Sequence, residues 1–394
     1  MSAKKGQIND FDLEDDLEEI EEKSKSSDDL KQTIIKMMVI IGGGILLLIL
    51  ILAISSMFTK KTYSYEQIET IMENAAKEYL NENPDALKIA ETKTVEVPVA
   101  NLVASGKMYD LAEYVAPGVS CTGSVTVVKA NQQFVYTANL NCGDSYSSVP
   151  LYAKVLQDSP ITKSGYGLYS MNGEKVFRGE NVNNYVKLEK ALWRIVKIDS
   201  DNGVVLIKDT QIGFTAAWDN RYNQNIGYNV GINEYSSSRI KEYIEEKYNT
   251  AKEDEIFLSA NDKAKLAPID LCVGSRATNS KTNSNGIECK TKLHNQKIGL
   301  LTVSDYINAS IDVNCHTAEN KSCQNYNYLV KNFNWWLTTP VTNTTDRAYS
   351  VNTKGEINAS PTADYYNVRP VIKLNSAVAI TGGTGTESDP YILK

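Results

Sequence analysis

Histidine is nearly absent from this chain of 394 residues, which contains only His294 and His316. Both lie in loop-like sequence rich in Asn and Lys, where no neighbour is patterned to orient a catalytic imidazole. The adjacent Cys315 and His316 have no second ligand cluster at zinc spacing. No glycine-rich phosphate loop follows a predicted strand, because the run at 382–385 lies in a turn-like tail. We therefore expect no enzyme activity and no metal or cofactor site.

An excess of positive charge is also lacking. The formal net charge is −7 and the pI is about 5.2, which argues against nucleic acid as a partner. Residues 1–36 alone hold eleven acidic residues and six lysines, a net charge of −5. Such a charge-rich stretch favours a solvated acidic tail over a packed element.

Charge is missing altogether between Met37 and Phe58. A helix of this length is roughly 33 Å long, enough to cross a hydrocarbon core of about 30 Å. The leader before it is too long and too acidic for a cleaved signal peptide, and no cysteine follows closely for a lipoprotein anchor. We interpret residues 37–59 as an uncleaved signal-anchor, a single transmembrane helix in the lipid bilayer of the cell membrane.

Cysteine is absent before residue 121, and all six cysteines follow the apolar segment. An even number of cysteines on one side favours disulfides in an oxidising compartment. More lysines flank the apolar segment before it than after it, which places the N-terminus inside the cell and the C-terminus outside. From sequence proximity we predict three disulfides, Cys121–Cys142, Cys272–Cys289 and Cys315–Cys323.

Residues 60–150 indicate a stalk helix and a small α+β unit. A capping box at Ser64 and Gln67 opens a helix that Pro84 ends, with apolar residues at helical spacing between them. Two alternating segments, 123–128 and 133–140, then predict an antiparallel hairpin. The hairpin brings the two cysteines that flank it level with each other, which suits a disulfide.

The second half of the chain predicts a larger α+β domain. Residues 151–180 are polar and rich in Gly and Ser, and we interpret them as a bridging segment. Residues 181–394 show strand signals at both ends and a helical middle, which indicates a mixed domain around an antiparallel sheet. The predicted strands are 191–198, 204–208, 347–352, 368–374 and 390–393, and the predicted helices are 236–248, 259–266 and 304–309. We expect 191–208, 347–352 and 368–374 to share one sheet, with helices 236–248 and 304–309 packed on it.

Three ordered motifs carry a family resemblance: Trp335-Trp-Leu-Thr-Thr-Pro340, Tyr349-Ser-Val-Asn-x-x-Gly355 and Val368-Arg-Pro-Val-Ile-Lys-Leu374. They resemble an uncharacterised extracellular domain of surface proteins from low-GC gram-positive bacteria. Thr338 stands where that family usually has an arginine. The motif order is also distantly similar to C-type-lectin-like and formylglycine-generating-enzyme-like folds, although the calcium–sugar motif of sugar-binding lectins is missing. The resemblance implies an extracellular domain and names no ligand.

The paired tryptophans are the candidate ligand-binding residues. In an alternating strand one of Trp335 and Trp336 faces the core and the other faces outward. We expect the outward one, with Tyr349, to contribute to a binding surface. Further ligand contacts are expected from the loops at 270–325 and 338–346, because recognition usually lies on loops that a rigid scaffold displays.

These observations favour a non-catalytic binding or adhesion module at the cell surface, with an unknown glycan, wall or protein ligand. Two alternatives stay open. The order of membrane helix, stalk helix and small sheet is similar to type IV pilins, which favours a structural or pilin-like assembly component of the envelope. An envelope enzyme or an enzyme accessory is the other.

Overall fold

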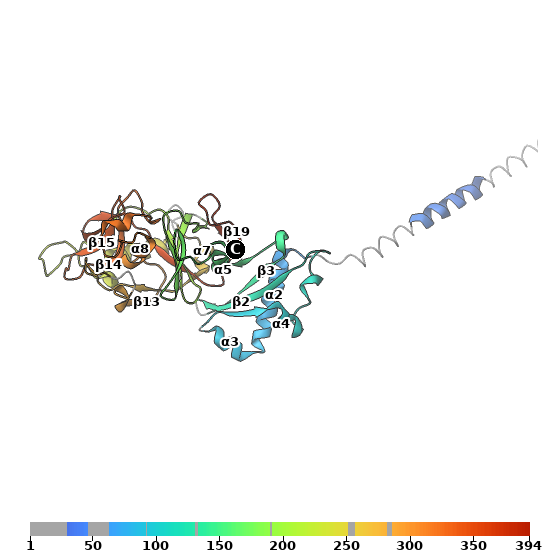
Figure 1. The fold of residues 1–394 in the computed structure, drawn as a ribbon. Coiled ribbons are helices and arrows are strands. Elements are labelled where there is room, and N and C mark those ends of the chain that lie inside the picture. The colour runs from blue at the N-terminus through green and yellow to red at the C-terminus, as the bar shows by residue number, and fades with distance from the viewer. Residues whose placement is uncertain are drawn as a thin grey trace, which may run out of the picture. The chain divides into compact units, whose positions relative to one another are not determined.

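The structure, a computed structural model, describes residues 30–45, 63–91, 93–130, 133–189, 191–250, 257–281 and 286–394. The chain divides into two units, one ending at Thr62 and the other spanning Tyr63–Lys394. In the first unit, residues 30–45 are helical and their apolar side chains are exposed (Figure 1, blue helix). The helices and strands named below all belong to the second unit.

The prediction of a transmembrane helix over 37–59 is corrected. In the part of the chain that the structure describes, no helix is both long enough and apolar enough to cross a membrane. The helix is described from residue 30 to residue 45. Residues 46–59 and the acidic tail up to residue 29 lie outside the described residues. The described residues contain helices, strands and three disulfides, so their fold class is mixed α+β.

Residues 63–148 form what we call the small module. Its first helix, α2 (Tyr65–Asn81), begins with the predicted capping box, in which Ser64 and Gln67 each accept the other's backbone N–H. The helix packs on an antiparallel sheet in the order β1-β2-β3 through a core that includes Ile68, Met72 and Val125. The other elements are α3 (Pro84–Ala90), β1 (Val95–Pro98), α4 (Val99–Ala104), β2 (Thr122–Ala130) and β3 (Gln133–Asn141). The predicted hairpin is confirmed as β2 and β3, with Thr122 opposite Asn141.

Residues 149–394 form the large module, built on a ten-stranded sheet in the order β11-β18-β9-β8-β7-β20-β19-β4, with the β5–β6 hairpin attached through β6 to β8. Its strands are β4 (Val149–Pro150), β5 (Gly167–Met171), β6 (Glu174–Arg178), β7 (Tyr185–Leu188), β8 (Ala191–Ile198), β9 (Val204–Lys208), β11 (Leu266–Ala267), β18 (Val371–Leu374), β19 (Ala379–Gly382) and β20 (Tyr391–Leu393). The predicted pairing of 191–208 with 368–374 is confirmed, because β18 runs antiparallel to β9. Neighbours in this sheet are antiparallel except β20 and β7.

The predicted strand 347–352 lies in a different sheet, so that part of the prediction was wrong. Strand β15 (Arg347–Val351) pairs with β14 (Trp335–Pro340) on one side and with β16 (Ile357–Pro361) on the other. The reason is local: Asn352 and Glu356 close a tight turn that leads β15 directly into β16. Both edges of β15 are then taken by its chain neighbours, and none is left for β18.

The predicted bridging segment, 151–180, is instead an integral part of the large module. It forms α5 (Leu151–Asp158) and the β5–β6 hairpin, and it buries Leu151, Val155, Leu168 and Phe177. Glycines and serines between the apolar residues obscure the periodicity, but these four side chains lie in the hydrophobic core.

Helices fill the middle of the large module as expected. They are α6 (Arg239–Asn249), α7 (Ala260–Ala264) and α8 (Val303–Ala309), and α7 and α8 both begin with capping boxes. Two short pairs of strands complete the fold: β10 (Ala216–Ala217) with β17 (Tyr365–Tyr366), and β12 (Ile269–Cys272) with β13 (Lys292–Gln296). Strand β14 lies close to α8 (Figure 1).

All three predicted disulfides are confirmed. The Cα atoms are 4.1 Å apart in Cys121–Cys142, 4.3 Å in Cys272–Cys289 and 4.6 Å in Cys315–Cys323. The first joins the ends of the β2–β3 hairpin, and the other two lie in the large module. All six cysteines are therefore paired within short stretches of sequence.

Candidate functional site

The predicted ligand-binding side chains, Trp335, Trp336 and Tyr349, are all buried, which corrects the expectation that one tryptophan faces outward. Trp335 meets Tyr306 edge to face, with ring centroids 5.9 Å apart. On the same ring lies the guanidinium of Arg369, 4.7 Å from the centroid. Trp335 is thus a core residue of the large module.

Trp336 points the other way, but that side of β14 is covered as well. Its indole N–H donates to the carbonyl of Ala216 at 2.9 Å, and its ring lies 4.7 Å from that of Tyr366. The β10–β17 pair therefore closes the face that alternation had predicted to be open. The hydroxyl of Tyr349 donates to the backbone carbonyl of Arg276 at 3.1 Å. These side chains hold elements together, and none of them is exposed to solvent.

A cleft of about 910 Å³ opens over the ten-stranded sheet and is the best candidate for a binding site. Strands β8, β9 and β18 form its floor with Lys197, Val205 and Lys373. The β5–β6 hairpin, the β12–β13 hairpin and the start of α8 form its walls. Part of the predicted 270–325 region, between Asp270 and Asn308, thus lines the cleft, while 309–325 and 338–346 do not.

Ion pairs connect the floor of the cleft to two of its walls. The ammonium of Lys197 lies 3.1 Å from Glu174 of β6 and 3.4 Å from Asp305 of α8. Asp305 also accepts the backbone N–H and the hydroxyl of Thr302, which caps its helix. One lysine on the sheet is therefore shared by a hairpin and a helix that come from distant parts of the sequence.

The protonation of this pair is fixed at neutral pH. Burial by itself lowers the pKa of Lys197 and raises that of Asp305, because a buried charge loses its hydration. The attraction between the two groups, with the hydrogen bonds to each, outweighs burial. The pKa of Lys197 therefore lies above its usual value and that of Asp305 below it. Both groups stay charged, which suits binding better than proton transfer.

Further charges of both signs line the cleft. Lys373 lies 3.0 Å from Asp199, whose other oxygen accepts the N–H groups of Asp201 and Gly203 in the β8–β9 turn. Asp270 of β12 also lines the cleft and lies 2.9 Å from the His294 ring. Burial raises the pKa of Asp270, but the Asn295 N–H and the ring of His294 bring it below its usual value.

A disulfide and a buried ion pair hold the wall formed by β12 and β13. Cys272 at the end of β12 is joined to Cys289, and both line the cleft. Next to them the fully buried Arg276 and Glu288 form an ion pair at 3.2 Å. Glu288 also accepts the N–H and the hydroxyl of Ser304 in α8. A buried pair of this kind holds the backbone in one arrangement, because breaking it leaves an uncompensated charge.

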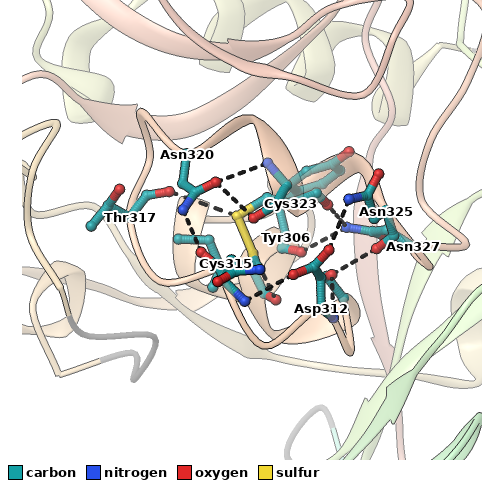
Figure 2. Close-up of a disulfide and its surroundings, with 12 residues drawn as sticks. Tyr306, Asp312, Cys315, Thr317, Asn320, Cys323, Asn325 and Asn327 are labelled. Carbon is teal, nitrogen blue, oxygen red and sulfur yellow. Dashed lines mark hydrogen bonds between the residues drawn. A yellow bond between two sulfur atoms is a disulfide. The ribbon is translucent and has the colours of Figure 1, made fainter.

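A second cystine loop of the predicted display region is also ordered, as Figure 2 shows around Cys315–Cys323. The Asn320 carboxamide accepts the Ser322 N–H and donates to the carbonyl of Asn314. At its base the amide of Asn327 donates to the carbonyls of Tyr306 and Cys323, both at 3.0 Å. This loop is packed against α8 and does not line the cleft.

Sequence reasoning overlooked the charged residues of the cleft. Lys197 had a visible signal, since it interrupts the apolar run of β8. Asp305 also had one, since it is the N3 residue of the capping box that Thr302 opens. Glu174 had none, because its hairpin was not predicted. Among the residues that the structure describes, no three His, Cys, Asp or Glu side chains are grouped so that they could hold a metal ion.

Residues 202–376 match the family model of a domain of unknown function (DUF6273). The matched range lies within the large module and includes β9, the β12–β13 wall and α8, but it begins after Lys197 and Glu174. The resemblance inferred from the motifs is thus supported at the level of an uncharacterised domain. No curated protein and no solved structure matches the chain.

Proposed function

We propose that residues 63–394 act outside the cytoplasm as a non-catalytic binding or adhesion module that holds a polar ligand in the cleft of the large module. The observation that carries the proposal is the cleft itself. Its volume of about 910 Å³ lies within the range of small-ligand sites, roughly 300–1,000 Å³. Its lining combines charged groups of both signs with apolar side chains such as Val205 and Val371.

The location outside the cytoplasm is supported by the cysteines. All six are paired, and structural disulfides persist mainly in oxidising compartments. The motif resemblance to an extracellular domain of gram-positive surface proteins agrees with this location. The distant likeness to C-type-lectin-like folds stays a prediction.

Binding is favoured over catalysis by the state of the charged groups. A general acid or base works best with a pKa near the working pH. In the cleft, the pKa of Asp305 and that of Lys197 are both moved further away from neutrality. Fixed charges of both signs, next to Asn172, Asn295 and Asn308, instead offer hydrogen bonds to a wall peptide, a glycan or a protein segment.

Filling the cleft tests the proposal. Ser200 is exposed in the β8–β9 turn and lines the cleft, so Ser200→Trp places a large ring in the opening. The matched control is Ser388→Trp, because Ser388 is exposed and lies outside the lining. The full chain and both variants are probed with an array of wall peptides, wall glycopeptides and host-type glycans.

We expect the wild type to bind at least one probe, and Ser200→Trp to weaken that binding tenfold or more at an unchanged melting temperature. Ser388→Trp should bind like the wild type. Equal binding by wild type and Ser200→Trp would show that the cleft is not the site. A wild-type chain that binds no probe would contradict the proposed role.

A further inference from the structure

A second surface of the large module displays aromatic side chains to solvent. Residues 219–233, which we call the Tyr/Asn loop, follow β10, and the Gly231 N–H closes the loop by donating to the Arg221 carbonyl at 2.9 Å. Tyr222 is 56% exposed, Ile226 40% and Tyr228 70%. Positions 224–229 are exposed without interruption. Side chains of this size are normally covered, so a group of them in solvent indicates a contact surface.

The loop is held rigidly in spite of its exposure. The buried amide of Asn223 donates to the carbonyl of Gly231 at 2.6 Å and to that of Thr345 at 3.1 Å. The hydroxyl of Thr362 donates to the carbonyl of Val230 at 2.8 Å. Gly231 has φ +83°, and a Cβ there would lie 2.1 Å from the carbonyl oxygen of Asp219, so only glycine fits. A surface that is ordered before its ligand arrives loses little entropy on binding.

Neighbouring residues extend this surface. Tyr365 of β17 is 60% exposed, and the amide of Asn220 lies within hydrogen-bond distance of its hydroxyl at 3.4 Å. Tyr365 stands opposite Ala217 in the β10–β17 pair, which leads directly into the loop. Tyr222 and Tyr228 flank the turn that the Asn223–Tyr228 backbone pair closes. Tyr222 and Tyr228 thus lie on the loop itself, and Tyr365 lies on the strand that pairs with β10 just before the loop.

Charge is sparse on this surface, and there is no excess of positive charge. No charged residue occurs between Tyr222 and Asn233, although 23% of the whole chain is charged. Within the loop Asp219 and Arg221 form an ion pair at 2.6 Å, and the residues next to Asn233 and Tyr365 in the sequence, Glu234 and Asp364, are acidic. Anionic polymers need several cations to bind, so phosphate-rich ligands do not fit this surface.

From this combination we infer that the Tyr/Asn loop and Tyr365 form a binding site for neutral oligosaccharides, separate from the cleft. The face of a tyrosine ring is electron-rich and attracts the polarised C–H groups on the flat side of a pyranose. The side-chain amides beside the rings supply both donors and acceptors for sugar hydroxyls. Neutral sugar rings with hydroxyl groups at their edges match a surface of exposed tyrosines with amides between them and few charges.

The experiment probes the full chain with an array of neutral and anionic oligosaccharides and then titrates the tightest neutral one. We expect Tyr222→Ala and Tyr228→Ala each to weaken binding about tenfold, as the loss of a stacked ring does. Tyr228→Phe should keep most of the affinity, because the ring remains. The matched control is Tyr109→Ala in the small module, whose tyrosine is 74% exposed, and it should bind like the wild type.

The Ser200→Trp variant separates this site from the cleft, and it should bind the neutral oligosaccharide normally. Unchanged melting temperatures of the loop variants will show that they are folded. The inference is overturned if the Tyr222→Ala/Tyr228→Ala double variant binds the sugar like the wild type, or if only Ser200→Trp loses it. It is equally overturned if no neutral oligosaccharide binds, or if the loop proves to bind a protein and no sugar.

Discussion

Lys197 reaches from the sheet into the cleft and holds two separate walls through one ammonium group. Glu174 belongs to the β5–β6 hairpin and Asp305 to α8, so the charge of Lys197 is shared between them. Such a shared cation fixes the relative positions of both elements, because moving either carboxylate away leaves a partly buried charge less well compensated.

We predict that Asp305→Asn lowers the free energy of unfolding by about 3 kcal/mol at pH 7, since it removes one partner of a buried pair. The pKa of Asp305 in the folded protein lies below its usual 3.8, so its stabilising charge is complete above that pH. The charge is lost as the pH falls through the folded pKa, and the difference from the wild type should then shrink. Denaturant unfolding between pH 7 and pH 2.5 measures this.

The control for this experiment is Glu246→Gln, a neutralised carboxylate at an exposed position of α6, which should change stability little at any pH. A stability difference between wild type and Asp305→Asn that stays constant down to pH 2.5 would contradict the role assigned to the ion pair.

For the paired tryptophans, the residue pattern predicted the direction of each side chain but not its burial. Alternation correctly places Trp335 and Trp336 on opposite faces of β14, because side chains of a strand alternate. It does not say whether each face is covered. The cover over Trp336 comes from Ala216 and Tyr366, which are far away in sequence and carry no signal of that contact. The charges of the cleft were overlooked for the same reason.

Among the elements, the β12–β13 hairpin depends most on a covalent link. Its two strands are short and share a register shift, while Cys272–Cys289 closes it at the end that faces the cleft. The hairpin supplies one wall of the cleft, so its order and ligand binding should be coupled.

We predict that the double variant Cys272→Ser/Cys289→Ser is less stable by about 3 kcal/mol, as expected for a cross-link that closes a loop of this length. Ligand binding in the cleft should fall as well, even under conditions where the variant is fully folded. Thermal unfolding and probe binding are measured side by side. The matched control is Cys315→Ser/Cys323→Ser, which should lose about 2.5 kcal/mol but keep cleft binding, since that loop does not line the cleft. Unchanged ligand binding by Cys272→Ser/Cys289→Ser, or loss of binding in the control alone, would contradict the coupling between the hairpin and the cleft.

Short-range patterns predicted the elements better than their partners. The α2 capping box, the β2–β3 and β8–β9 hairpins and the disulfides all depend on neighbours in sequence, and all are confirmed. The choice of sheet for β15 depends on which edges are free after folding, and no local pattern contains that information. The buried role of 151–180 was hidden because its few apolar residues are spread among glycines and serines.

On the scale of the whole molecule, the segment that matches the domain of unknown function is only part of a folding unit. Residues 202–376 contain β9, β11 and β18, but β8, β7, β20, β19 and β4 of the same sheet lie outside them. Strand β9 would lose its partner β8, together with the buried Trp193.

We predict that a fragment of residues 202–376 does not fold cooperatively, because it exposes the apolar faces that β7 and β8 cover. A fragment of residues 147–394 should fold, since its core is separate from that of the small module. Denaturant unfolding followed by circular dichroism, with both fragments under identical conditions, measures the difference. A cooperative transition of the 202–376 fragment would contradict the prediction.

The parallel pairing of β20 with β7 was not predicted from the sequence. It has a consequence for the folding of this protein during its synthesis. Val186 pairs with Tyr391, so one edge of β7 stays unpaired until Tyr391 has been synthesised. The small module has local pairings and can form while synthesis continues, whereas contacts between distant residues form slowly. An unpaired strand edge invites association with other chains. A nascent chain of this protein therefore needs protection between synthesis of β7 and the arrival of β20.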